Sequence, residues 1–207
     1  MAKLKIHGIA KSRAFRTLWV ADEAGVPYEH VQTSFADTTS KTPEFLKINP
    51  MGQVPAIDDD GFGLSESMAI NLYIAKKHGK GLYPSDLKGE AKVWQWAFFA
   101  ATSLERSMGL FVANRYTLPA EKRNEAVAQE NLDAVKRALS VLDAELGKSP
   151  YLLGQSFTVA DLCVASVLYG AWFNKHDFSS TPKLAAWLER CLTRPACLSA
   201  RKLREAA

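Results

Sequence analysis

Residues 48–57 read Ile-Asn-Pro-Met-Gly-Gln-Val-Pro-Ala-Ile and place a proline inside a segment that otherwise favours a β-strand. Val54, Ala56 and Ile57 surround Pro55, and a short apolar run of this kind is typical of a buried strand. A proline has no N–H to donate to a sheet, so sheets hold it only at strand starts, edges and bulges. Pro55 therefore marks either an ordinary strand entry or a stretch of backbone kept open for another molecule to bind.

Strand-like and helix-like segments alternate around this stretch, up to about residue 80. Leu4 and Ile6 share one face of the first strand, and Gly25-Val26-Pro27 ends the first helix. Asp58-Asp59-Asp60-Gly61 is a hairpin signal between the last two strands. The predicted order is strand 3–7, helix from 15, strand 28–33, helix 42–47 opening with Thr42-Pro43, strands 54–58 and 63–66, and helix from 67. This order predicts a mixed sheet in an α/β domain.

Beyond residue 87 only helical signals remain. An apolar stripe at helical spacing runs from Val135 to Leu146, and Thr158 with Asp161 forms a capping box in its acidic form. The predicted helices are 88–116, 119–146, 158–168, 184–192 and 197–204. The expected division is an α/β domain at 1–80, a linker at 81–87 and an all-helical domain at 88–207.

Composition and charge argue against several classes of protein. The 207 residues carry a formal net charge of +4, and the basic side chains are scattered rather than clustered, so we do not expect nucleic-acid binding. No apolar run has the length of a membrane span, and residues 1–8 do not read as a signal peptide, so we expect a cytoplasmic protein. Three cysteines without a C-x-x-C pair and four dispersed histidines argue against a disulfide framework, a metal site and a dithiol redox motif.

Three motifs on this scaffold carry a family resemblance. They are Asn-Pro-Met-Gly-Gln-Val-Pro at 49–55, Glu-Ser-Met-Ala-Ile-Asn-Leu-Tyr-Ile at 66–74, and Gly-Gln-Ser-Phe-Thr-Val-Ala-Asp-Leu at 154–162. With these motifs in this order, essentially the whole chain resembles the cytosolic, bacterial-type glutathione S-transferases of the serine type. The resemblance implies a thioredoxin-like first domain, an all-helical second domain, glutathione as co-substrate and no metal. It also implies an enzyme that conjugates the glutathione thiolate to hydrophobic electrophiles.

The resemblance gives Pro55 a specific role. In the family the corresponding proline follows a cis peptide bond, so we expect a cis bond between Val54 and Pro55. The N–H and C=O of Val54 then turn away from the sheet, and the extended γ-Glu-Cys-Gly tripeptide can pair with them like an added strand. Gln53 is expected to contact the γ-glutamyl end of the same ligand.

Glu66 and Ser67 stand at the end of a strand and the start of a helix. Ser67 is expected to cap this helix, and the positive helix N-terminus suits the γ-glutamyl carboxylate. Glu66 is expected to meet the ammonium group of the same γ-glutamyl residue. Lys41, just before the short helix, is expected to pair with the glycyl carboxylate. Structural alternatives exist for all three: a plain helix cap, an exposed acid and a surface lysine.

The loop at residues 8–13 is where the resemblance places the group that activates the thiol. No tyrosine precedes the second strand and no cysteine lies in this half of the chain, so Ser12 is the candidate catalytic hydroxyl. We also expect Ser12 to cap the first helix, and the backbone N–H groups of the loop are an alternative source of thiolate stabilisation. Serine-type relatives often carry this serine a few residues earlier, where the present chain has Ile9. Arg13 and Arg16 could add positive potential, although a solvated helix face is the commoner place for such residues.

The hydrophobic electrophile is expected between the domains, where Phe111 and Trp172 are candidates to line its pocket. The resemblance implies a homodimer, with the first domain of one subunit against the second domain of the other. Two other functions remain open: a glutathione-dependent isomerase or dehalogenase on the same scaffold, and a non-catalytic transferase-like binding module. Thr158, Asp161 and Cys163 are expected to be structural.

Overall fold

The computed structural model describes residues 3–206 and divides the chain into two compact units. The first unit comprises the residues up to Pro84 together with those from Thr193 onward, and the second comprises Ser85–Leu192. The domain boundaries expected at 80 and 88 stay a prediction. These units differ from that division in one respect. The helix at residues 195–205 belongs to the α/β unit and packs against its first helix, whereas it was expected in the all-helical domain.

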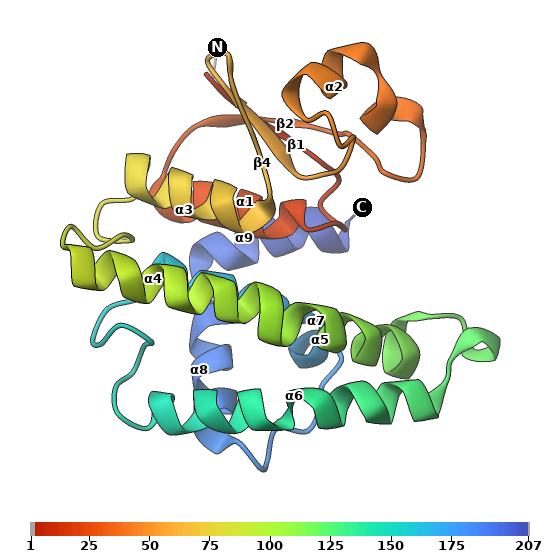
Figure 1. Ribbon diagram of the computed structural model, residues 1–207, viewed down its shortest axis with the longest axis vertical. Coiled ribbons are helices and arrows are strands. Elements are labelled where there is room, and N and C mark those ends of the chain that lie inside the picture. Colours follow the sequence, from red (N-terminus) through yellow and green to blue (C-terminus); the bar gives the residue numbers. More distant parts are fainter. Residues whose placement is uncertain (1–2, 207) are drawn as a thin grey trace. The chain divides into compact units, whose positions relative to one another are not determined.

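A four-stranded mixed sheet forms the centre of the first unit, with strand order β2-β1-β3-β4 (Figure 1). β1 is parallel to β2 and antiparallel to β3, and β3 is antiparallel to β4. Ile6 of β1 lies between His30 of β2 and Ile57 of β3, and both isoleucines are fully buried. The strands are Leu4–His7 (β1), Tyr28–Val31 (β2), Ala56–Asp59 (β3) and Phe62–Ser65 (β4). This sheet confirms the predicted thioredoxin-like fold.

The helices of the first unit cover both faces of the sheet. They are α1 (Ala14–Ala24), the 3₁₀ turn η1 (Thr38–Lys41), α2 (Pro43–Ile48), α3 (Ser67–His78) and α9 (Pro195–Glu205). α1 packs against α3 and also against α9, while α2 lies on the other side of the sheet (Figure 1). The start of α2 is as predicted, because Thr42 Oγ1 accepts the N–H of Phe45 at 3.3 Å and Pro43 occupies the first helical position.

Two predicted helix caps are wrong by one residue. Arg13, not Ser12, is the N-cap of α1, and Glu66, not Ser67, is the N-cap of α3. Neither of these N-cap side chains makes a capping hydrogen bond. The serines were assigned from their residue type, but the chain enters each helix through backbone geometry set by neighbouring elements. The Ser12 hydroxyl nevertheless accepts the N–H of Ala14, the first residue of α1, at 3.0 Å, and the Ser67 hydroxyl accepts a hydrogen bond from Arg16.

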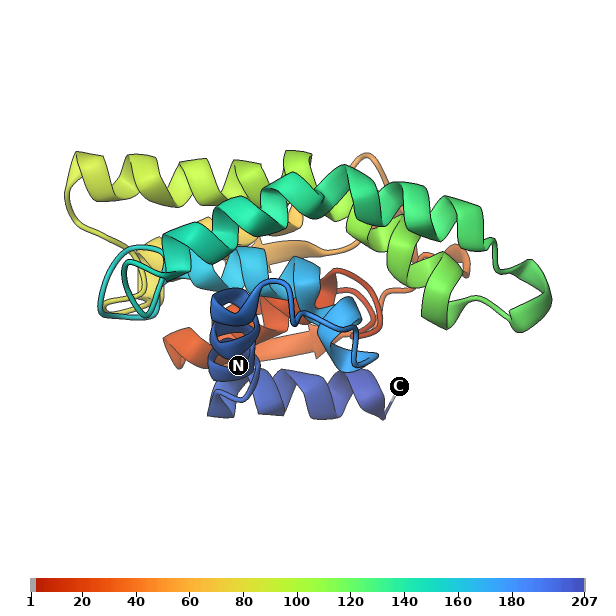
Figure 2. The same ribbon diagram turned by 90° about the horizontal axis from the view of Figure 1, so that it is seen from below.

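The second unit is all-helical, as predicted. Its elements are α4 (Leu87–Phe99), the π-helical turn η2 (Ala100–Leu104), α5 (Glu105–Val112), the π-helical turn η3 (Ala113–Thr117), the 3₁₀ turn η4 (Ala120–Lys122), α6 (Glu125–Leu146), α7 (Val159–Phe173) and α8 (Pro182–Leu192). Figure 2 shows α6 running alongside α5, against which it packs. The predicted apolar stripe of α6 is buried at Val135, Leu139, Leu142 and Leu146.

The capping box of α7 is also confirmed, and it belongs to a larger buried network. Asp161 Oδ2 accepts the backbone N–H of Thr158 at 3.0 Å. Asp161 Oδ1 accepts the N–H of Leu152 and the indole N–H of Trp187, both at 2.9 Å. Cys163 is fully buried in the same helix. Among residues 3–206, no helix has both the length and the apolar character needed to cross a membrane.

Candidate active site

The loop from Gly8 to Arg13 connects β1 to α1 and is held close to the segment around Pro55. Gly8 adopts a φ of 139°, and a Cβ atom there would lie 2.7 Å from Cβ of Ala14 and 3.2 Å from Cβ of Val54. Only glycine fits this approach without displacing its neighbours. The fold therefore brings the predicted catalytic loop directly beside the predicted ligand-pairing residue.

Ser12 is half-buried near the end of this loop. Its Oγ donates to the carbonyl of Ile9 at 2.7 Å and accepts the N–H of Ala14 at 3.0 Å. To donate to a thiolate, the hydroxyl proton must rotate away from the Ile9 carbonyl while the Ala14 bond holds the oxygen in place. The backbone N–H of Lys11 has no hydrogen-bond partner within the described part of the chain. The loop thus offers one hydroxyl and at least one amide donor.

The peptide bond between Val54 and Pro55 is cis, as predicted. β3 begins only at Ala56, and neither the N–H nor the C=O of Val54 has a partner among residues 3–206. The preceding residue is fixed through its backbone, since the Asn49 side-chain amide donates to the carbonyl of Gln53 at 2.7 Å. The Gln53 side chain is exposed. An extended ligand could therefore pair with the Val54 backbone.

Glu66 has an unusual backbone conformation immediately before α3. Its φ of 70° and ψ of 108° lie outside the regions that most side-chain-bearing residues adopt. Such conformations persist only when the surrounding structure determines them, and they cluster at functional sites. Ser67 follows as the first helical residue and is 7% exposed. The positive end of α3 is suited to an anionic group, and the neighbouring Glu66 side chain is exposed and acidic.

Arg16 is a site residue to which the sequence gave too little weight. Its side chain is buried rather than solvated, and its Nη1 donates to Ser67 Oγ at 3.4 Å. The permanent positive charge therefore lies at the N-terminus of α3, where it adds to the helix dipole. The available signal was its position, because α1 is buried continuously from Ala14 to Ala21 and a solvent-facing arginine does not fit within that run.

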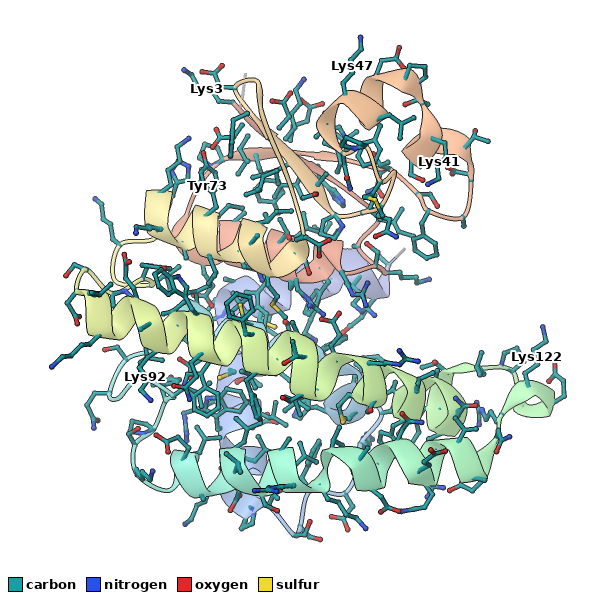
Figure 3. All side chains as sticks on the ribbon, viewed as in Figure 1. Lys3, Lys41, Lys47, Tyr73, Lys92 and Lys122 are labelled. Carbon is teal, nitrogen blue, oxygen red and sulfur yellow. The ribbon has the colours of Figure 1, made fainter. Side chains whose placement is uncertain are left out.

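Lys41 lies beside the turn that leads to Gln53. Its ammonium nitrogen donates to the carbonyl of Gly52 at 2.9 Å and to that of Met51 at 3.3 Å. Figure 3 shows its side chain at the end of η1, next to α2. The structure thus brings Lys41, Gln53 and Val54 into one region of the first unit.

The two predicted substrate-pocket residues lie in the second unit. Phe111 is 2% exposed and packs edge-on against the rings of His176 and Tyr116, at centroid distances of 4.8 and 5.7 Å. Trp172 is half-buried, and its indole N–H donates to Glu189 at 3.1 Å. Phe111 is therefore part of the core of this unit. Contact of either residue with a substrate stays a prediction.

The described residues were also searched for a metal-binding cluster and for a reactive cysteine. Within residues 3–206, no group of three or more His, Cys, Asp or Glu side chains is arranged to hold a metal ion. None of the three cysteines forms a disulfide, and all three are buried. Cys197 belongs to the first unit, but burial raises its pKa to about 12, so its thiol is not ionised near neutral pH.

Family models and individual relatives identify the family of this chain. The model of the glutathione S-transferase N-terminal domain matches residues 2–76, and that of the C-terminal domain matches residues 98–195. Glutathione S-transferase F13 of Arabidopsis thaliana is 34% identical over 206 residues, covering 94% of this chain and 93% of its own. The chain belongs to the glutathione S-transferase family. Its enzymatic activity is glutathione transfer.

Solved structures of two other glutathione S-transferases cover nearly the whole chain. Glutathione S-transferase I from maize, in complex with an atrazine glutathione conjugate, superposes with a TM-score of 0.89 at 30% identity and covers 100% of both chains. A theta class glutathione S-transferase from Xanthomonas axonopodis pv. citri, with glutathione bound, has a TM-score of 0.88 at 30% identity and covers 97% of both. Glutathione is therefore bound by close structural relatives of this transferase.

A relative of a different kind is elongation factor 1-gamma 2 of Oryza sativa subsp. japonica. It is 34% identical over 171 residues, which is 82% of this chain but only 40% of the elongation factor. The transferase fold therefore also occurs as one part of a longer protein with another name and role. Fold alone does not decide chemistry, so the assignment of individual residues must come from the site.

Proposed function

We propose that this transferase binds glutathione along the backbone of Gln53 and Val54 and activates its thiol at Ser12. The observation that carries this proposal is the backbone of Val54, which has no hydrogen-bond partner within residues 3–206 and lies beside the Ser12 loop. Pairing of a peptide with such a segment supplies main-chain hydrogen bonds, as in recognition by strand addition. The cysteinyl residue of glutathione then lies opposite Val54, with its sulfur toward the loop.

The two ends of the tripeptide are recognised by opposite charges. The γ-glutamyl carboxylate binds at the N-terminus of α3, next to Ser67 and the buried guanidinium of Arg16. The γ-glutamyl ammonium pairs with Glu66, and Gln53 contacts the same end. Lys41 pairs with the glycyl carboxylate at the opposite end. This arrangement selects a ligand with a zwitterionic head and an anionic tail.

Catalysis then consists mainly of stabilising a thiolate. A cysteine thiol with a pKa of about 8.5 is only about 3% ionised at pH 7, and lowering that pKa to about 7 takes roughly 2 kcal/mol. The Ser12 hydroxyl and the loop amides supply this stabilisation, and the thiol proton leaves to solvent. The sulfur attacks an electrophilic carbon of a hydrophobic substrate, a carbon–sulfur bond forms, and the leaving group departs with its electron pair. Phe111 and Trp172 remain the proposed substrate contacts.

We further propose that the enzyme is a cytosolic homodimer, which its resemblance to the cytosolic transferases supports. α4 carries three large apolar side chains that fall on one helical face: Leu87, Trp94 and Phe98 are 74%, 40% and 69% exposed. Large apolar side chains exposed together on one face of a helix are typical of protein–protein contact sites. A second copy of the chain is the partner that this face fits.

The test is titration with glutathione, followed by measurement of the pKa of the bound thiol from thiolate absorbance. In Ser12→Ala we expect this pKa to rise by about one unit and kcat/KM with an aryl halide to fall about tenfold near neutral pH, because one charge-assisted hydrogen bond is lost. Ser12→Thr keeps the hydroxyl and serves as the control. Glutathione affinity should change less than about twofold in both.

Other outcomes separate the alternatives. An unchanged thiol pKa in Ser12→Ala assigns the thiolate stabilisation to the loop amides instead. Failure to bind glutathione at millimolar concentration contradicts the whole proposed site. Binding without turnover of aryl halides, enones or epoxides would favour a binding module, and turnover by isomerisation or dehalogenation alone would favour the other enzymatic function.

A further inference from the structure

The last helix of the chain contacts the catalytic loop directly. Arg204, on α9, donates from Nη1 to the carbonyl of Ala10 at 3.0 Å and to that of Ser12 at 3.2 Å. Its guanidinium carbon lies 5.5 Å from the ring centre of Phe15 on α1. One side chain thus holds carbonyls on both sides of Lys11, within the segment that ends at Ser12.

The other end of α9 is held to α1 by a partly buried ion pair. Arg194 donates from Nε and Nη2 to the two carboxylate oxygens of Glu23, at 2.6 and 2.9 Å. The Glu23 carboxylate is only 7% exposed, and it also accepts the indole N–H of Trp19 at 3.1 Å. Bidentate pairs of this kind are geometrically specific. The start of α9 is therefore held against α1. This contact also fixes the position of the helix from which the Arg204 side chain reaches the loop.

Holding these two carbonyls also fixes two N–H groups. A trans peptide unit is planar, and its C=O and N–H point in opposite directions. The carbonyls of Ala10 and Ser12 point at Arg204, so the N–H groups of Lys11 and Arg13 point away from α9. The Lys11 N–H has no partner within residues 3–206. The Ser12 carbonyl also accepts the backbone N–H of Phe15 at 3.3 Å, so Arg204 and the first turn of α1 together hold the backbone from which the Ser12 hydroxyl projects.

We propose that Arg204 is a positioning residue for thiolate stabilisation: it holds the 10–12 segment so that the Ser12 hydroxyl and the Lys11 N–H face the sulfur of bound glutathione. This role rests on the proposed function of the Ser12 loop. Arg204 itself touches neither glutathione nor the electrophile. Its two hydrogen bonds orient the Ser12 hydroxyl and the Lys11 N–H. Other residues bind the γ-glutamyl and glycyl ends of glutathione.

The experiment compares the wild-type protein with Arg204→Met. This variant keeps an unbranched apolar side chain against Phe15 but removes the guanidinium, and with it both hydrogen bonds from Nη1. The readouts are the pKa of the bound thiol, the pH profile of kcat/KM with an aryl halide, and the dissociation constant for glutathione. We expect the thiol pKa to rise by about one unit, kcat/KM at pH 6.5 to fall about tenfold, and the dissociation constant to change less than about threefold. Arg204→Lys, with one donor nitrogen, should fall between the two.

Lys202→Ala is the matched control, because Lys202 is an exposed cation on the last turn of the same helix. It should behave like the wild type. The difference between wild type and Arg204→Met should also persist at 0.5 M salt, where long-range effects of charge are screened. An unchanged thiol pKa in Arg204→Met, or an equal shift in Lys202→Ala, overturns the positioning role.

Two further outcomes are separable. If thermal unfolding shows that Arg204→Met does not fold, Arg204→Lys is measured in its place. A thiol pKa and a pH profile of kcat/KM that both equal those of the wild type in Arg204→Lys then overturn the proposal. If the wild-type protein itself does not lower the pKa of the bound thiol, the proposed function of the Ser12 loop has failed, and Arg204 has nothing to position.

Discussion

Gly52 is constrained by its own backbone and by a neighbouring side chain. Its φ is 59°, and a Cβ atom would lie 2.5 Å from the Lys41 ammonium nitrogen and 2.8 Å from the carbonyl oxygen of Ser40. In Gly52→Ala we expect a loss of about 1–2 kcal/mol from the left-handed backbone alone, and displacement of Lys41. Glutathione affinity should therefore fall about two- to fivefold, while affinity for γ-glutamylcysteine, which lacks the glycyl carboxylate, should change less.

The control for this substitution is Gly25→Ala at the end of α1. Gly25 has a similar φ of 63°, but a Cβ atom there would have no non-neighbouring atom of residues 3–206 within 4 Å. It should lose comparable stability in thermal unfolding and keep full affinity for glutathione. Equal affinity losses for glutathione and γ-glutamylcysteine in Gly52→Ala would contradict the assigned role of Lys41.

At the scale of single residues, the sequence predicted features that depend on neighbouring residues. It did not predict contacts between residues far apart in the chain. The cis bond before Pro55 and the Thr42 cap follow from short motifs whose physics lies within a few residues. The burial of Arg16 against Ser67 and the contact of Arg204 with the Ser12 loop join residues 51 and 192 positions apart. No pattern within one helix specifies such a partner.

At the scale of elements, Asp59 connects β3 to α3. Its side chain is 4% exposed and accepts hydrogen bonds from Lys77 Nζ at 2.6 Å and from the Tyr73 hydroxyl at 2.8 Å; Tyr73 is labelled on α3 in Figure 3. Burial by itself raises the pKa of this carboxyl, but the hydrogen bonds from Lys77 and Tyr73 outweigh it, and the pKa lies below its ordinary value of 3.8. The ionised form is therefore the one that the fold stabilises.

A pH dependence of stability follows from the sign of this shift. Because the folded pKa lies below the unfolded one, Asp59 contributes stability above pH 3.8 that is lost as the pH falls through the folded pKa. Asp59→Asn should cost about 1–2 kcal/mol at pH 7, and the gap to the wild type should narrow in denaturant titrations below about pH 4.

Asp60→Asn is the matched control, since Asp60 pairs with Lys3 at a site where both side chains are more than 60% exposed. Asparagine also tolerates the positive φ of 57° at this position. This variant should stay within about 0.5 kcal/mol of the wild type at every pH. A gap between Asp59→Asn and the wild type that stays constant down to pH 2 would show that the ionisation of Asp59 is not involved.

At this scale the sequence predicted most helices and strands. It did not predict the N-cap residues of two helices or the π-helical turns of the second unit. The capping box of α7 and the apolar stripe of α6 could be predicted, because their residues recur at fixed helical spacings. The π-helical turns η2 and η3 within the stretch 87–117 were not predicted, because an extra residue in a turn depends on how the flanking helices pack. The caps at Arg13 and Glu66 were missed for the same kind of reason.

At the scale of the whole molecule, the exposed face of α4 gives a test of the proposed homodimer. Phe98→Glu places a charge on this apolar face, so we expect the dimer dissociation constant, measured by sedimentation, to rise at least about thirtyfold. Val141→Glu on α6 is the control, because Val141 is also exposed, at 48%, but lies on another helix. A wild-type protein that sediments as a monomer, or an unchanged Phe98→Glu dimer, would contradict the proposed interface.

The discontinuity of the first unit has a consequence for synthesis on the ribosome. β1 to α3 emerge first, but α9, which anchors on Glu23 and holds the Ser12 loop, emerges only after Ser85–Leu192 have been made. At about 5–20 residues per second, those residues take roughly 5–20 s to translate. During that interval all the residues of the sheet have been made, but the catalytic loop lacks the Arg204 contacts. A nascent chain therefore acquires the hydrogen bonds from Arg204 to this loop only after α9 has been made.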